Sequence, residues 1–247
     1  MNTTPTAAPT TTVASRLPSV GWPVLIGVLL LRTVLLFAAN LAMLPLFGSY
    51  DRTLMWPYVT LVLVDVISIV VIAMLLRRRG QTLADLISFR LRDTGWALLV
   101  TVILIVGFFV ATFIGNLVAY LGPPPTPSWE GFSPPLWYAL WTVLVAPITI
   151  ALAEELLYRG WAQPELTART NKVLAIGIMA FFFALQHAAF TPLDLQAQVA
   201  RFVAMFLSGI LFGVLYLWRK RLWPLIFAHW FLDVIGLGLP VLFAALA

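Results

Sequence analysis

Hydrophobic residues run along this chain in long continuous stretches, and polar residues are confined to the short segments between them. Seven such stretches cover residues 21–45, 56–76, 95–121, 135–160, 171–190, 197–218 and 222–246. Each can supply the roughly 20 apolar residues that a membrane-crossing helix needs. Continuous apolarity without alternation indicates helices and not strands, and only helices or closed barrels cross lipid. The pattern therefore predicts an all-α fold, a polytopic transmembrane helical bundle.

The number of spans depends on the last stretch, in which Gly236, Gly238 and Pro240 stand close together. We count seven transmembrane helices, or eight if this cluster breaks the last one. In the fourth stretch, Pro147 is expected to kink its helix, because proline has no N–H for the helical hydrogen-bond ladder. In the sixth, the small residues Gly209 and Gly213 favour close helix packing within the chain over a dimer face.

The composition agrees with a membrane protein of one domain. Of the 247 residues, 62% are hydrophobic and 10% are charged, and the mean hydropathy is +0.98. Residues 1–19 are rich in Thr, Pro and Ala and are predicted to be a disordered N-terminal tail. Residues 20–247 are predicted to form a single transmembrane domain. The absence of cysteine excludes disulfides, thiolate nucleophiles and cysteine metal sites.

Basic residues cluster in three loops that fall on one side by parity. They are Arg77, Arg78, Arg79, Arg90 and Arg92 after the second stretch, Arg169 and Lys172 after the fourth, and Arg219, Lys220 and Arg221 after the sixth. The loop 122–135 on the other side has no Lys or Arg. The positive-inside rule therefore predicts that the N-terminus and these three loops of the multi-pass protein lie in the cytoplasm. The Thr-rich tail and compact size are compatible with a bacterial cytoplasmic membrane, which we expect. We expect residues 80–94 to form a short amphipathic helix in the membrane interface, with Leu83, Leu86 and Ile87 on its apolar face.

Two opposite charges fall near the middle of the first two stretches. These are Arg32 and Asp65, and neighbouring antiparallel helices would hold them at similar depth. Buried charges usually find partners. We interpret the two residues as a structural ion pair and not as catalytic groups.

The only two histidines of the chain, His187 and His229, and its only adjacent acids, Glu154 and Glu155, also lie in apolar stretches. A charged side chain at the bilayer centre costs about 2.5–3.5 kcal/mol, so such groups are usually kept for function. Arg159 follows Glu155 by four residues, which places the two on one helical face as an ion pair. Glu154 points about 100° away and is left to act as a base. The pattern indicates a buried reaction site, and polar contacts between helices are the simpler alternative.

Counting along the chain places these groups at one level. If a hairpin turns between Thr170 and Asn171, Glu154 and His187 each lie 16 residues from the turn. At 1.5 Å per residue, both lie roughly 25 Å from its tip. The polar tip is expected to project into the cytoplasm, which would bring the pair into the cytoplasmic half of the bilayer, where His229 can converge on it.

Three blocks of residues in order resemble the CPBP family of intramembrane proteases, which includes the CAAX prenyl endopeptidases and bacterial abortive-infection and bacteriocin-immunity proteins. The EExxxR block is Glu154, Glu155 and Arg159, the FxxxH block is Phe183 and His187, and the HxxxN/D block is His229 and Asp233. The resemblance predicts a CPBP-like catalytic core at about 135–247. One departure is Leu225, where the family often has phenylalanine, and this exchange affects packing only.

The resemblance implies an intramembrane endopeptidase that acts on a membrane-associated protein or peptide. Glu154 and His187 would hold and deprotonate the attacking water, and His229 and Asp233 would stabilise the oxyanion. Because only a protonated carboxyl donates a hydrogen bond, Asp233 could instead orient His229. Glu155, Arg159 and Phe183 would support the site. The basic residues report membrane topology, so no nucleic-acid partner is expected.

Two questions stay open at the level of the sequence. We expect no metal cofactor, because the chain lacks an HExxH motif, and the alternative is a zinc ion held by Glu154, His187 and His229. The alternative function is a non-catalytic member of the fold that acts as a bacteriocin-immunity or membrane scaffold protein. A proton-coupled transporter is less favoured, because no internal repeat is visible.

Overall fold

The computed structural model describes residues 20–125 and 133–247, so the predicted tail 1–19 and half of the loop 122–135 lie outside the described residues. Within the described ranges, seven helices are long and apolar enough to cross a membrane. Their bounds follow the seven predicted stretches, which confirms the polytopic helical bundle. The protein is an integral multi-pass membrane protein.

The first three spans are separated by short helical turns. The spans are α1 (Trp22–Phe47), α3 (Pro57–Arg77) and α5 (Thr94–Tyr120), and the turns are α2 (Tyr50–Thr53), α4 (Leu83–Ile87) and η1 (Leu91–Asp93). The amphipathic helix expected within 80–94 is therefore shorter than predicted. Its apolar residues Leu83, Leu86 and Ile87 pack against the protein core. Asp85 accepts hydrogen bonds from the backbone N–H and the hydroxyl of Thr82, which caps α4 and lowers the pKa of the Asp85 carboxyl.

The fourth span, Leu136–Arg169, is one helical segment with two irregular points. It consists of α6 (Leu136–Leu144), α7 (Ala146–Glu154), the π-helical η2 (Glu155–Ala162) and α8 (Gln163–Arg169). The interruption at Val145 lies just before Pro147, as predicted from the missing proline N–H. The π-helical turn begins directly after Glu154, and such turns are frequent at functional sites.

The last three spans follow from a tight turn at residues 170–171. They comprise α9 (Lys172–His187) with η3 (Ala188–Phe190), then α10 (Leu195–Arg219), and finally α11 (Leu222–Asp233), η4 (Val234–Gly238) and α12 (Leu239–Leu246). Asn171 caps α9 by accepting the Leu174 N–H at 2.9 Å, which confirms the predicted turn. The glycine cluster around Gly236 forms a π-helical turn within the last span and does not split it.

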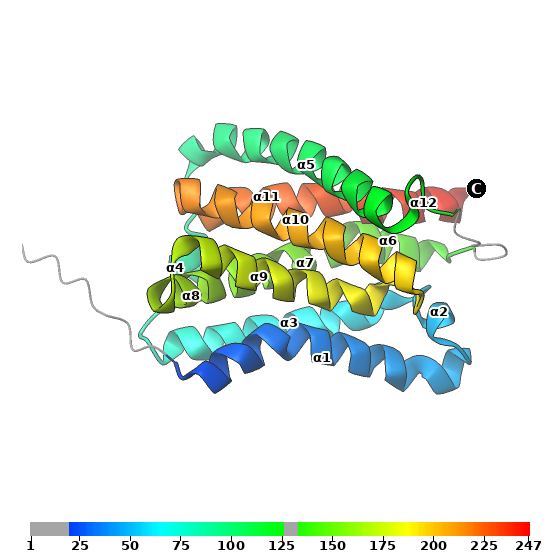
Figure 1. Ribbon diagram of the computed structural model, residues 1–247, viewed down its shortest axis with the longest axis horizontal. Coiled ribbons are helices and arrows are strands. Elements are labelled where there is room, and N and C mark those ends of the chain that lie inside the picture. The colour runs from blue at the N-terminus through cyan, green and yellow to red at the C-terminus, as the bar shows by residue number, and fades with distance from the viewer. Residues whose placement is uncertain (1–19, 126–132) are drawn as a thin grey trace, which may run out of the picture.

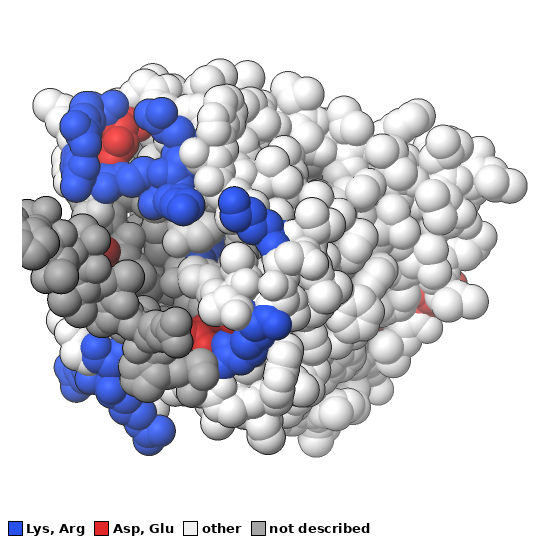
Figure 2. All heavy atoms as spheres, turned by 60° about the vertical axis from the view of Figure 1, so that its left-hand side comes forward, with Lys and Arg blue, Asp and Glu red and all other residues white. Residues whose placement is uncertain are grey.

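In the bundle, α5 packs on α10 and α11 (Figure 1). The helices α9 and α7 lie between α10 and α11 on one side and α1 and α3 on the other. Lys and Arg side chains gather at one end of the bundle (Figure 2). This end carries the C-termini of α3, α8 and α10, so the three basic loops share one side, as parity predicts.

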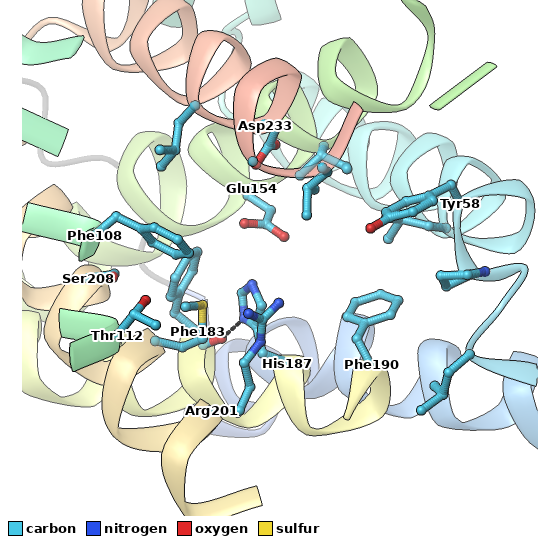
Figure 3. A pocket seen from close by; sticks show the side chains of 18 of the residues that line it. Tyr58, Phe108, Thr112, Glu154, Phe183, His187, Phe190, Arg201, Ser208 and Asp233 are labelled. Carbon is cyan, nitrogen blue, oxygen red and sulfur yellow. Dashed lines mark hydrogen bonds between the residues drawn. The ribbon is translucent and has the colours of Figure 1, made fainter. Parts of the chain in front are cut away.

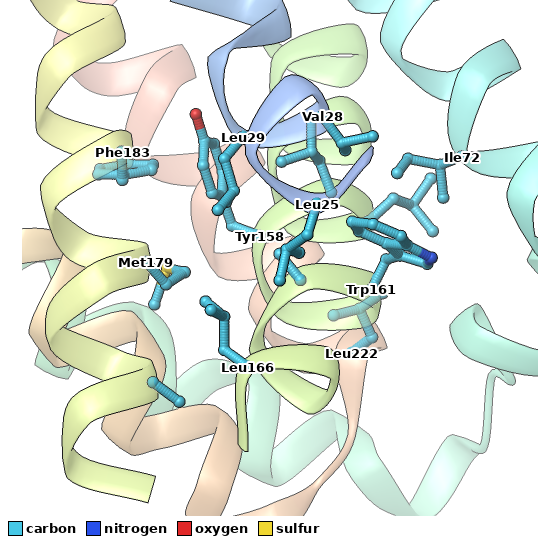
Figure 4. Packing of buried hydrophobic residues seen from close by; sticks show 14 of the residues in the cluster. Leu25, Val28, Leu29, Ile72, Tyr158, Trp161, Leu166, Met179, Phe183 and Leu222 are labelled. Carbon is cyan, nitrogen blue, oxygen red and sulfur yellow. The ribbon is translucent and has the colours of Figure 1, made fainter. Parts of the chain in front are cut away.

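The main apolar core surrounds η2. Leu25 and Leu29 of α1 pack with Tyr158 and Trp161 of η2 and with Met179 of α9 (Figure 4). These five side chains are at most 1% exposed. The core therefore anchors the segment that immediately follows Glu154.

Close contact between α9 and α10 depends on glycine. A Cβ added at Gly209 would lie 3.0 Å from the Ala180 Cα, and one added at Gly213 would lie 3.0 Å from the Met179 Cε. Both glycines face α9 of the same chain, which confirms their predicted role in intramolecular packing.

Candidate functional site

The buried ion pair of the first two spans reaches the fourth span as well. Arg32 Nη1 lies 2.5 Å from Asp65 Oδ1, and both side chains are fully buried. The same guanidinium donates through Nη2 to Glu154 Oε1 at 3.1 Å. The predicted ion pair between Arg32 and Asp65 is thus confirmed. Through Arg32 it also contacts Glu154, so the pair is part of the candidate site.

Gln186 completes the contacts of one Glu154 oxygen. Its Nε2 donates to Glu154 Oε1 at 3.0 Å, and its own Oε1 accepts the Nε–H of Arg32 at 2.7 Å. Glu154, which the sequence left free to act as a base, therefore has a cation bound to one of its oxygens. Its second oxygen, Oε2, is buried and has no hydrogen-bond partner among the described residues. One oxygen of Glu154 is fixed, and the other is available.

The second acid, Glu155, is held as predicted. Arg159 Nη1 donates to Glu155 Oε1 at 2.9 Å, one helical turn along the chain. The Arg159 guanidinium lies over the rings of Phe183 and Phe212, 4.6 Å from each centroid. Aromatic faces attract cations, and they do so more strongly where water is excluded. The block residue Phe183 therefore supports the site through Arg159.

His229 lies between three acids. Its Nδ1 is 2.9 Å from Glu155 Oε1, while its Nε2 is 3.7 Å from Glu154 Oε2 and 3.6 Å from Asp233 Oδ2. An ionised carboxylate can only accept, so the Nδ1–H donates to Glu155. Both ring nitrogens face carboxylate oxygens, an arrangement that favours an imidazole protonated at both positions.

His187 presents one ring nitrogen to the protein and one to open space. Its Nδ1 lies 2.7 Å from the carbonyl oxygen of Phe183. Since a carbonyl only accepts, Nδ1 carries the hydrogen, and Nε2 of the neutral ring is an acceptor. Just beyond His187, the carbonyl of Ala189 accepts from Asn40 Nδ2 at 2.6 Å and from the Tyr50 hydroxyl at 2.8 Å. These bonds fix the end of α9 that carries the histidine.

All four residues expected to be catalytic line one cavity of about 710 Å³, namely Glu154, His187, His229 and Asp233. Figure 3 shows Glu154 and Asp233 on one side of this space, with His187 opposite them on α9. Glu154 and His187 are therefore brought face to face, as the counting from the hairpin turn predicted.

The cavity extends toward the end of the bundle opposite the basic loops. Its lining includes three exposed residues, Asp51 and Arg52 in α2 and Pro192 shortly before α10. The mouth of the cavity therefore lies away from the basic loops, and the depth of the site in the bilayer stays a prediction. His187 is the last residue of α9 and lies about 23 Å along the helix from its start at Lys172, close to the distance counted from the turn.

Sequence reasoning missed three polar residues of the site. Gln186 was passed over because it is neutral, although it precedes His187 directly. Arg201 and Tyr58 also line the cavity, and Figure 3 shows both side chains pointing into it. Arg201 could have been found from its position within an apolar stretch, which is the signal that identified Arg32.

The arrangement does not fit a zinc ion held by Glu154, His187 and His229. Among the described residues, no three His, Asp or Glu side chains converge closely enough to hold a metal ion. The geometry instead leaves two acceptors, Glu154 Oε2 and His187 Nε2, on opposite walls of one space.

Comparison with known proteins adds one finding. Residues 134–235 match the family model described as type II CAAX prenyl endopeptidase Rce1-like, which belongs to the CPBP family. This range contains α6 to α11 and all three predicted blocks. Nothing among curated proteins or solved structures matches this chain. Residues 134–235 are thus similar to the Rce1-like type of the CPBP family, a family of CAAX-protease-type membrane endopeptidases.

Proposed function

We propose that this protein hydrolyses a peptide bond of a membrane-associated protein or peptide with a water activated by Glu154 and His187. The observation that carries the proposal is the state of Glu154 Oε2, which is buried, lacks a hydrogen-bond partner among the described residues and lies at the wall of the cavity. A general base needs a free lone pair within reach of the proton that it takes. Arg32 and Gln186 fix the other oxygen and thereby aim this one.

In the first step, Glu154 Oε2 takes a proton from the water, and the water oxygen bonds to the carbonyl carbon of the scissile peptide. His187 Nε2 accepts a hydrogen bond from the remaining O–H of the water and thereby orients the attacking oxygen. The carbonyl electron pair moves onto its oxygen and forms an oxyanion. The His229 Nε2–H donates to this oxyanion, and a donor aimed at such a charge is worth about 3 kcal/mol.

In the second step, the oxyanion re-forms the carbonyl as the bond between carbon and nitrogen breaks. The proton on Glu154 passes to the leaving nitrogen, which departs as an amine, and the other product is a carboxylic acid. Glu154 returns to its ionised form. The water is activated without a metal ion in this scheme.

Asp233 and Glu155 act on His229 and not on the substrate. Both place carboxylate oxygens beside its ring nitrogens, at 3.6 and 2.9 Å, which favours the protonated imidazole that donates to the oxyanion. Arg159 holds Glu155 in place from the adjacent turn. We assign Asp233 to the orientation of His229, because an ionised carboxylate would repel the oxyanion.

The basic end of the bundle supports a location in a bacterial cytoplasmic membrane, with the N-terminus in the cytoplasm. In this orientation the cavity extends toward the extracytoplasmic side. The substrate segment would then enter from that side or from the lipid.

The test compares membranes that contain the wild type, Glu154→Gln, His187→Gln or the exposed-site control Asp85→Asn. Peptides released in each preparation are identified by mass spectrometry. We expect peptides that the wild type and Asp85→Asn release and that both site variants fail to release, with all four proteins folded and equally abundant.

Two outcomes would contradict the proposal. Release of the same peptides by Glu154→Gln would show that this residue is not the base. A wild type that releases no peptides, while a host phenotype of the gene survives Glu154→Gln, would favour a non-catalytic immunity or scaffold protein.

A further inference from the structure

Arg201 is a cation inside the cavity that makes no ion pair within the described chain. It lies on α10, its side chain is partly buried, and its Nε is buried without a hydrogen-bond partner. Figure 3 shows the side chain extending past His187 toward the space in front of Glu154. Arg32 and Arg159, the other two arginines of the site, each bind a carboxylate within 3.1 Å.

The acids nearest to Arg201 already have other partners. Its electrostatic neighbours are Tyr58, Asp233 and Glu154. Glu154 is bound by Arg32, and Asp233 lies 3.6 Å from His229. A cation in a water-poor space is costly unless an anion joins it. Arg201 therefore has an unused capacity to bind an anion.

The surroundings of Arg201 fit an apolar peptide with one anionic group. Most of the cavity wall is apolar, including Phe108, Ile150, Phe190 and Leu237. A guanidinium binds carboxylates with two parallel hydrogen bonds. The hydroxyl of Tyr58 points into the same space and offers another donor.

We propose that Arg201 is a substrate-binding residue that pairs with a carboxylate of the peptide, either the terminal carboxylate or that of an acidic side chain. This inference rests on the proposed function, because only a protease would use the bound peptide as its substrate. The binding itself requires only the cavity and the unpaired guanidinium. It predicts that the protein selects peptides by one negative charge placed near the scissile bond.

The test measures binding in a Glu154→Gln background, in which cleavage is blocked, in nanodiscs of zwitterionic phosphatidylcholine. The probes are four short apolar fluorescent peptides of one sequence. The first pair differs only in a free or an amidated C-terminus. The second pair is amidated and differs only in an internal Asp or Asn. Fluorescence anisotropy compares the background protein with added Arg201→Gln, Arg201→Lys or, as a control cation at the mouth of the cavity, Arg52→Gln.

We expect one charged peptide to bind at least about tenfold more tightly than its neutral twin, because paired hydrogen bonds between a guanidinium and a carboxylate are among the strong ones. The pair that shows this preference identifies the source of the carboxylate. Arg201→Gln removes the preference while the neutral peptides bind as before, which shows that the variant is folded. Arg201→Lys keeps part of the charge preference, since an ammonium lacks the paired hydrogen-bond geometry of a guanidinium. Arg52→Gln keeps the whole preference.

The inference is overturned if neither pair shows a preference, if Arg201→Gln keeps it, or if Arg52→Gln removes it equally. Cleavage of the same peptides by protein with Glu154 intact reports separately on the proposed function. A charge preference without cleavage would leave the Arg201 site standing and refute the protease. Cleavage without a charge preference would support the protease and refute the Arg201 site.

Discussion

Glu154 and Gln186 are 32 residues apart in the chain, yet the Gln186 amide donates a 3.0 Å hydrogen bond to Glu154 Oε1. This bond fixes the register between the fourth and fifth spans at the level of the candidate site. Gln186 also accepts from Arg32 at 2.7 Å, so three helices meet at one neutral side chain. The position of His187, the next residue, depends on this register.

Gln186→Leu should destabilise the protein and lower proteolysis together. Leucine keeps the approximate volume but leaves the Arg32 Nε–H unpaired, and an unsatisfied buried polar group costs about 1–3 kcal/mol. Thermal unfolding in detergent and peptide release would measure both effects. The control is Gln196→Leu, which loses only an exposed bond to the Ala119 carbonyl and should change little. An unchanged melting temperature for Gln186→Leu would refute its role in fixing the register.

Arg32→Met should be more damaging, because it leaves the carboxylates of Asp65 and Glu154 buried without their cation. Removing one partner of a buried ion pair costs about 3–5 kcal/mol. The double variant Arg32→Met/Asp65→Leu removes one of the two stranded charges and should recover part of the stability. Chemical unfolding of both variants and of Asp65→Leu completes a double-mutant cycle. Additive losses would show that the two residues do not interact.

Gly115→Ala should push α5 away from α10. A Cβ at this position would collide with the carbonyl oxygen of Ala200, which is backbone and cannot rotate away. Overpacking of this kind typically costs about 1–3 kcal/mol. Because Ala200 precedes Arg201, binding of the charged peptide should weaken as well.

The matched control for this substitution is Gly27→Ala. An added Cβ at Gly27 meets nothing within 4 Å, and alanine favours a helix by up to about 1 kcal/mol over glycine. Its melting temperature should therefore stay equal or rise. Equal behaviour of the two alanine variants would contradict the close approach of α5 and α10.

Cysteine labelling can fix the orientation of the cavity, because the chain has no native cysteine. Asp51→Cys lies at the mouth of the cavity, and Lys220→Cys lies in the basic loop at the other end. Both positions are exposed. We expect a membrane-impermeant maleimide to label Asp51→Cys in intact cells and Lys220→Cys only after permeabilisation. The reverse pattern would place the mouth of the cavity in the cytoplasm.

Features that depend on neighbouring residues could be predicted from the sequence. The seven spans follow from continuous apolarity, because a lipid-exposed segment must satisfy its backbone hydrogen bonds internally and present mostly apolar side chains. The pairs Glu155 with Arg159 and His229 with Asp233 follow from the helical period, and the break before Pro147 follows from its missing N–H. The three blocks also pointed to the family whose model matches residues 134–235.

Relationships between helices were decided only by the tertiary structure. The sequence placed Arg32 and Asp65 at one depth, but the packing of α1 against α9 and η2 was needed to bring the guanidinium to Glu154. The unpaired state of Arg201 and the direction of the cavity likewise depend on how far each helix is rotated and shifted against its neighbours. Apolar patterning fixes which segments lie in the membrane, whereas in a bundle whose helices are apolar on nearly every side, only packing fixes which side faces which neighbour.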